Sequence, residues 1–161
     1  MYLKEKNIKI RKMAQESFLK LNKENLISRL GDFFKSQVDV ELAYLFGSTA
    51  EGTEGPLSDI DVGVYLSNNL TPEQKIEKRL KLTSELVGFL KTNNIDLIIM
   101  NNASPIINFE IIKPNTPLFI KDKDFKLGVE QRIMSIYLDR KYHEELLNRG
   151  FLDRFKRRGG L

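Results

Sequence analysis

The alternation of apolar and polar positions along the chain predicts helices and strands in alternating order. Apolar residues three or four positions apart are typical of helices packed on a core, and continuous or alternating apolar runs are typical of strands. Val40–Phe46 is apolar on both faces, which indicates a strand in the middle of a sheet. The predicted helices cover residues 5–21, 22–34, 72–90 and 124–147, with brief helices at 49–52 and 105–112, and the predicted strands cover residues 40–46, 58–66, 95–100 and 118–121.

Capping residues mark where several of these helices begin. Asn22 can cap the second helix, and Thr71–Gln74 is a capping box with Pro72 at the first helical position. Ser104 and Pro105 open a short helix in the same way. The faces expected to be buried are Leu26, Ile27, Leu30, Phe33 and Phe34 on the second helix, Ile76, Leu80, Thr83, Val87 and Leu90 on the next long helix, and Phe125, Val129, Ile133, Ile136 and Tyr137 on the last one.

This order of elements predicts an α/β (α+β) fold with one small, mixed, twisted sheet flanked by helices, mainly on one side. The last helix is expected to end before Gly150 and to leave a basic tail. Residues 1–21 are expected to form an N-terminal helical extension. Residues 22–161 are expected to form the main domain, which includes the long C-terminal helix and the tail.

Composition narrows the class of protein. Of the 161 residues, 41% are hydrophobic and 30% are charged, which is typical of a folded globular domain rather than a disordered chain. Neither a signal peptide nor an apolar run of roughly 20 residues is present, so no membrane span is predicted. The chain has no cysteine, which excludes disulfides and thiolate metal sites, and a cytoplasmic location is expected. The net charge of +4 is too small to indicate nucleic acid as a direct substrate.

The chemistry-bearing pattern is Gly47-Ser48, a ten-residue interval, and the pair Asp59 and Asp61. Side chains alternate along a strand, so the two carboxylates would project together while Ile60 enters the core. Adjacent carboxylates repel each other unless a cation lies between them, which indicates a hard divalent metal. A glycine turn leading into a short helix offers free N–H groups to phosphate. Together these features indicate a nucleoside triphosphate.

A third carboxylate, Asp96, begins a later strand and shares a face with Ile98 and Met100. That face is compatible with a position opposite Asp61 in a sheet. Each feature also has a simpler interpretation from the residues alone. The two-Asp pattern can be a solvated turn, Gly47-Ser48 can be only a tight strand-to-helix turn, and Asp96 can merely end the turn at Asn93-Asn94.

At Gly47, Ser48, Asp59, Asp61 and Asp96 the chain resembles the polymerase-β-like nucleotidyltransferases and, within them, the minimal nucleotidyltransferases (MNT). The resemblance implies ATP as substrate and a two-metal Mg²⁺ site. The aspartates would be the catalytic and metal-binding residues, with Asp61 bridging both ions and Asp96 helping to deprotonate the acceptor hydroxyl. Gly47 and Ser48 would bind the phosphates. One residue departs from the pattern, because family members commonly carry a basic residue where this chain has Glu51.

The resemblance also implies a partner. Stand-alone MNT proteins often pair with a HEPN protein as antitoxin and toxin, and the MNT protein transfers AMP to a tyrosine of the HEPN ribonuclease. An assembly with such a partner is therefore expected. Two alternatives stay open: a small-molecule adenylyltransferase, for instance toward an aminoglycoside, which an acidic acceptor pocket would favour, and an antitoxin that acts by binding alone, for which Glu51 is the best sign.

Overall fold

The computed structural model describes residues 23–51 and 58–157, without the side chains of residues 153 and 155–157. The predicted helix over residues 5–21, the Asn22 cap, the loop at 52–57 and the end of the basic tail lie outside the described residues.

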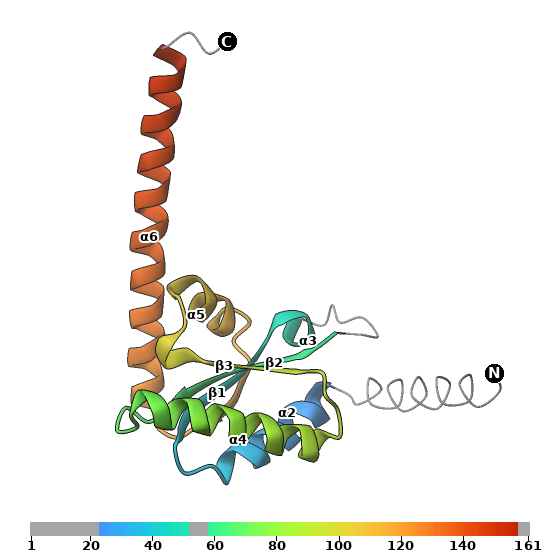
Figure 1. Cartoon of the computed structure of the whole chain (residues 1–161). Helices are drawn as coiled ribbons and strands as arrows, with labels where there is room; N and C mark the ends of the chain where they lie inside the picture. The colour runs from blue at the N-terminus through green and yellow to red at the C-terminus, as the bar shows by residue number, and fades with distance from the viewer. Residues whose placement is uncertain (1–22, 52–57, 158–161) are drawn as a thin grey trace, which may run out of the picture.

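Four strands form one mixed sheet in the order β3-β2-β1-β4 (Figure 1). β1 (Val40–Phe46) pairs antiparallel with β2 (Ile60–Leu66) on one side and with β4 (Pro117–Ile120) on the other. β2 pairs parallel with β3 (Ile95–Ile99), which lies at the edge of the sheet. The interior position of β1 agrees with its apolar residues on both faces, and the predicted mixed sheet is confirmed.

Helices cover both faces of the sheet, whereas the sequence predicted them mainly on one. Two helices pack on one face, and a second pair packs on the other (Figure 1). The reason is that β1 sends apolar side chains both ways, Ala43 and Leu45 to the first face and Leu42 and Tyr44 to the second. The helices of the first face are α2 (Lys23–Lys35) and α4 (Pro72–Leu90), and those of the second are α5 (Pro105–Ile112) and the first part of α6 (Lys123–Arg157).

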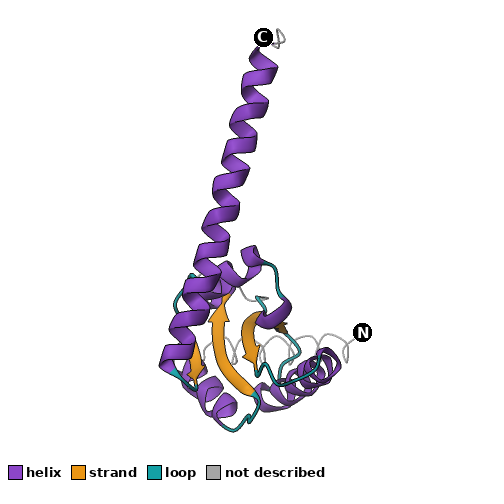
Figure 2. Ribbon diagram, turned by 90° about the vertical axis from the view of Figure 1, so that its left-hand side faces the viewer, coloured by secondary structure: helices purple, strands orange, loops and turns teal. Residues whose placement is uncertain are grey.

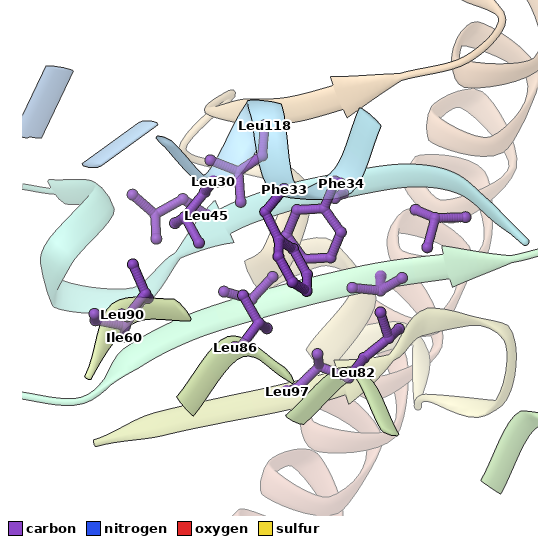
Figure 3. Close-up of a cluster of buried hydrophobic side chains, with 14 of the residues drawn as sticks. Leu30, Phe33, Phe34, Leu45, Ile60, Leu82, Leu86, Leu90, Leu97 and Leu118 are labelled. Carbon is purple, nitrogen blue, oxygen red and sulfur yellow. The ribbon is translucent and has the colours of Figure 1, made fainter. Parts of the chain in front are cut away.

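The first-face core shows which side of each helix points inward (Figure 3). On α2 the predicted stripe is confirmed, and Leu30 and Phe34 are fully buried. On α4 the prediction was right for Leu90 but wrong for the rest of the stripe, because Leu82 and Leu86 are the other buried residues while Ile76 and Leu80 are exposed. Full burial of a Leu or Phe side chain contributes roughly 1.5–3 kcal/mol. The buried stripe of α4, whose leucines are spaced by four residues, therefore fixes the orientation of this helix.

The last helix, α6, has 35 residues and is longer than predicted. Gly150 lies inside the helix instead of ending it, and Arg154 Nε donates a hydrogen bond to the Gly150 carbonyl. At 1.5 Å per residue the helix spans about 50 Å. Its C-terminal half extends beyond the sheet domain (Figures 1 and 2). Among the described helices, none is both long and apolar enough to cross a membrane.

Candidate functional site

The turn at Gly47 brings the backbone directly against a carboxylate. Gly47 follows β1 and starts the short helix α3 (Gly47–Glu51) with a φ of +68°. A Cβ added to Gly47 would lie 2.1 Å from Oδ2 of Asp61, far inside van der Waals contact. Both the positive φ and this close approach require glycine. Gly47 therefore fixes where the Asp61 carboxylate can lie.

Strand register places Asp61 between the Gly47 turn and Asp96. Asp61 is opposite Phe46 of β1 on one side and opposite Asp96 of β3 on the other. Asp59 lies just before β2, outside the strand that was predicted to contain it, and its carbonyl accepts a hydrogen bond from Thr49 Oγ1 of α3 at 3.2 Å. Asp61 is half-buried, while Asp59 and Asp96 are exposed. The three aspartates therefore lie at one end of the sheet, beside α3.

The neighbouring carboxylates make ionisation of Asp61 more costly. Burial, followed by the negative charges of Asp96 and Asp59, raises the pKa of Asp61 above its ordinary 3.8. Each of these causes disfavours the carboxylate form, and a bound cation would relieve all of them. The site therefore favours positive charge beside Asp61.

The residues present fit a hard divalent cation in charge and in donor type. Carboxylate oxygens are the ligands that Mg²⁺ prefers, and Mg²⁺ needs them at about 2.0–2.1 Å. In the part of the chain that the structure describes, no three His, Cys, Asp or Glu side chains stand close enough together to hold an ion as they are placed. Charge repulsion acts over longer distances than coordination, so the raised pKa of Asp61 and the open arrangement are consistent. Asp59 and Asp96 are exposed, so core packing does not hold either side chain in place.

The helix α3 carries the other predicted residues and is contacted by one that the sequence did not indicate. Ser48 is half-buried as the second residue of α3, and Glu51 is exposed at its end. The missed residue is Lys23, at the start of α2, whose Nζ donates a hydrogen bond to the Ala50 carbonyl. Because Lys23 is 27 residues from Ala50 in sequence, no local pattern predicts this contact. Lys23 therefore brings a positive charge to α3, the helix in which Glu51 replaces the basic residue common in the resembling family.

A groove of about 530 Å³ runs along the free edge of β3 and reaches Asp96. The edge strand and the helices on either side of it form its walls, and Arg79 Nε donates a hydrogen bond to the Leu97 carbonyl there at 3.0 Å. Asp96 is its one acidic lining residue among those described, against two basic residues. The lining includes Lys75, Ile76 and Arg79 of α4, Asp96 and Ile98 of β3, and Ile107 of α5.

Comparison with known proteins identifies the family of the chain. The profile of the polymerase beta nucleotidyltransferase family matches residues 28–124, more than half of the chain. Over 107 residues the chain is 29% identical to the protein adenylyltransferase MntA of Shewanella oneidensis, covering 66% of this chain and 71% of that protein.

Two solved structures share the fold. A toxin–antitoxin structure with AMP-PNP aligns at a TM-score of 0.58 and 23% identity, covering 82% of this chain and 99% of that one. A complex of the tri-AMPylated Shewanella oneidensis HEPN toxin with its MNT antitoxin aligns at a TM-score of 0.52 and 21% identity, covering 82% and 97%. At these identities the likeness is one of fold.

Proposed function

The chain belongs to the polymerase beta nucleotidyltransferase family, and from this premise we propose that it is an MNT-type enzyme, which transfers AMP from ATP to a tyrosine of a HEPN toxin and thereby acts as an antitoxin. The observation that carries the proposal is the position of Asp61, held under the Gly47 turn and opposite Asp96. The related MntA is a protein adenylyltransferase, and a structural neighbour is an MNT antitoxin bound to an AMPylated HEPN toxin.

The nucleotide would lie on the Gly47 side of Asp61. Gly47 lets a phosphate approach the backbone, and Ser48 would donate a hydrogen bond to it. Lys23 would supply the positive charge that Glu51 cannot, since its ammonium already reaches α3. A structural neighbour with AMP-PNP supports an adenine nucleotide as the substrate. With Lys23 in this role, Glu51 no longer favours an antitoxin that acts by binding alone.

Three carboxylates divide the remaining work. Asp59 and Asp61 would hold the Mg²⁺ on the triphosphate, and Asp61 with Asp96 would hold a second ion. When bound, the ions neutralise charge at the α-phosphate and lower the pKa of the attacking hydroxyl. Asp96 would accept the proton of that hydroxyl as its oxygen bonds to the α-phosphorus. The bond from this phosphorus to the bridging oxygen breaks, and pyrophosphate leaves.

The groove beside Asp96 favours a protein acceptor over an aminoglycoside. An aminoglycoside is polycationic and would need an acidic acceptor pocket, because a cleft lined by negative charge attracts cationic ligands. Here the described lining has Lys75 and Arg79 against the single carboxylate of Asp96, and several of its other residues are isoleucines. Such a surface suits a protein segment.

The test follows the position of the label in ATP. The protein, Mg²⁺ and a purified HEPN toxin are incubated with ATP labelled either at the α-phosphate or at the γ-phosphate. AMP transfer predicts that only α-labelled ATP marks the toxin, and that removal of Mg²⁺ by EDTA abolishes the signal. Labelling from γ-labelled ATP, or none from either, would overturn the proposal. Parallel reactions with an aminoglycoside as the acceptor test the small-molecule alternative.

A further inference from the structure

We infer that the groove along the free edge of β3 is the docking site of the acceptor protein, which places an apolar side chain in the groove beside the reacting hydroxyl and an acidic side chain at Lys75. This inference rests on the proposed transfer and specifies its substrate: a protein segment recognised at the groove. The groove lies between α4 and the segment leading into α5, and Asp96 stands in its wall.

The order of the strands separates the two substrates. Asp61 lies in β2, the Gly47 turn follows β1 on one side of it, and Asp96 lies in β3 on the other. With the triphosphate at the Gly47 turn, the opposite side of Asp61 is left for the acceptor. The groove opens on that side, at the outer edge of β3. A molecule seated in the groove therefore presents its reactive atom to Asp96.

The walls of the groove carry exposed apolar side chains, which do not stabilise the folded domain while they face water. Ile76 of α4 is 63% exposed and Ile107 of α5 is 41% exposed, although the two helices pack on opposite faces of the sheet. Ile98 of β3 lies between them in the lining. Exposed apolar residues that converge from separate elements are typical of a binding site. An apolar side chain of the acceptor would cover them.

The backbone of β3 indicates how the occupant binds. Ile60 N–H donates to the Asn94 carbonyl, so carbonyls two residues apart from Asn94 face β2 and that of Leu97 faces outward. The Leu97 carbonyl already accepts the hydrogen bond from Arg79. A side chain bonded to an edge carbonyl blocks the addition of a further strand. The acceptor segment therefore binds through its side chains.

Charge completes the description of the acceptor. Lys75 is half-buried in the groove wall and has no ion pair among the side chains that the structure describes. Arg79 uses its Nε–H on the Leu97 carbonyl, so Lys75 is the groove cation whose donors all remain available to a ligand among the described residues. Asp96 would repel an acidic group placed next to it. An acidic side chain on the acceptor therefore belongs at Lys75, away from the reacting hydroxyl.

Two matched pairs of variants test the groove. Ile76→Asp and Ile107→Asp place a charge in it, whereas Leu80→Asp and Ile106→Asp place the same charge on the same helices outside it. The controls are 67% and 42% exposed, close to their partners. Initial rates of AMP transfer are measured against the concentration of a purified HEPN toxin, and Mg-ATP binding is measured by calorimetry.

Each groove variant should raise the KM for the toxin about tenfold or more, because an apolar contact of this size is lost and a charge is buried. The kcat and the affinity for Mg-ATP should stay near normal, and both control variants should behave like the wild type. Lys75→Glu should also raise the KM, and a toxin with a Lys in place of the acidic contact should restore it. Circular dichroism checks folding, with Ile76→Ser and Ile107→Ser replacing any variant that does not fold.

Groove variants that match the wild type in KM would overturn the inference while leaving AMP transfer intact. A loss of Mg-ATP binding in them would also overturn it, because the groove would then serve the nucleotide. If the wild type transfers no AMP, the proposed function fails on its own. Calorimetry of toxin binding with the same variants then decides the docking site, since unchanged affinity contradicts it and a tenfold loss supports it.

Discussion

Replacing Gly47 with alanine tests how the turn controls the carboxylate site. A residue with a side chain pays roughly 1–2 kcal/mol to adopt the positive φ of 68°. The new Cβ would also meet Asp61 Oδ2 at 2.1 Å and its Cγ at 3.0 Å, so the carboxylate must rotate away. Holding Asp61 off its preferred rotamer adds about 0.5–1.5 kcal/mol.

The expected loss of stability for Gly47→Ala is therefore about 1.5–3.5 kcal/mol, or a fall in Tm of roughly 3–14 °C for a chain of this size. Displacing a reacting group by an ångström costs about a hundredfold in rate, so AMP transfer should fall by that order. Thermal unfolding followed by circular dichroism and single-turnover transfer measure the two effects.

Gly88→Ala is the matched control for this substitution. Gly88 lies in α4, and nothing comes within 4 Å of a Cβ built on it. Alanine should stabilise the helix there by about 0.5–1 kcal/mol and leave transfer unchanged. Wild-type Tm and wild-type transfer in Gly47→Ala would refute the reasoning, as it would show that neither the backbone conformation nor the contact with Asp61 constrains the site.

Three further substitutions separate the roles of the site residues. Asp96→Asn should bind Mg-ATP near normally in calorimetry yet lose on the order of a hundredfold in rate, because a proton acceptor acts in the transition state; full turnover would make Asp96 a turn residue only. Lys23→Met should raise the KM for ATP while Lys35→Met, at the other end of α2, leaves it unchanged, and equal effects would dissociate Lys23 from the phosphates. Asp61→Asn in EDTA should raise the Tm at pH 7. Because the pKa of Asp61 is raised in the folded protein, protonation of this carboxylate stabilises the fold, and that stabilisation is present below about pH 3.8 and lost as the pH rises through the raised value. The gain in Tm from the substitution should therefore vanish below about pH 3.8. A gain that persists in acid would assign the effect to packing.

Features that depend on local spacing could be predicted from the sequence. The buried stripe of α2 is an example, and so is the capping box, in which Gln74 N–H donates to Thr71 Oγ1 and Gln74 Oε1 accepts from Thr71 N–H. The face of β3 that carries Asp96 also follows from alternation along the strand, since Ile98 packs on the second face and Leu97 on the first. These patterns need no knowledge of distant contacts.

Features that depend on distant contacts could not be predicted. Two apolar stripes of α4 fit the helical period, and the choice between Leu82 and Ile76 depends on what the sheet and α2 present to the helix. The predicted end of α6 was wrong because a single glycine costs only about 1 kcal/mol in a helix. The helix continues through Gly150, so the neighbouring residues offset this cost.

The candidate site divides in the same way. The aspartates and Gly47 follow from sequence spacing, but the contact between Gly47 and Asp61 depends on strand register and the turn conformation. Lys23 reaches α3 only because the fold packs the two elements together, and no periodicity could indicate it. The groove beside Asp96 likewise forms from elements that are separate in the sequence.

The central claim, adenylylation of a HEPN toxin by this aspartate site, is tested most directly by intact-mass measurement of the toxin. The toxin is incubated with ATP, Mg²⁺ and either the wild type or the double variant Asp59→Asn with Asp61→Asn, whose amides keep the side-chain shape. The account predicts a mass increase of one or more adenylyl groups, mapped to tyrosine, with the wild type alone. An unchanged mass with the wild type, or an equal increase with the double variant, would contradict it.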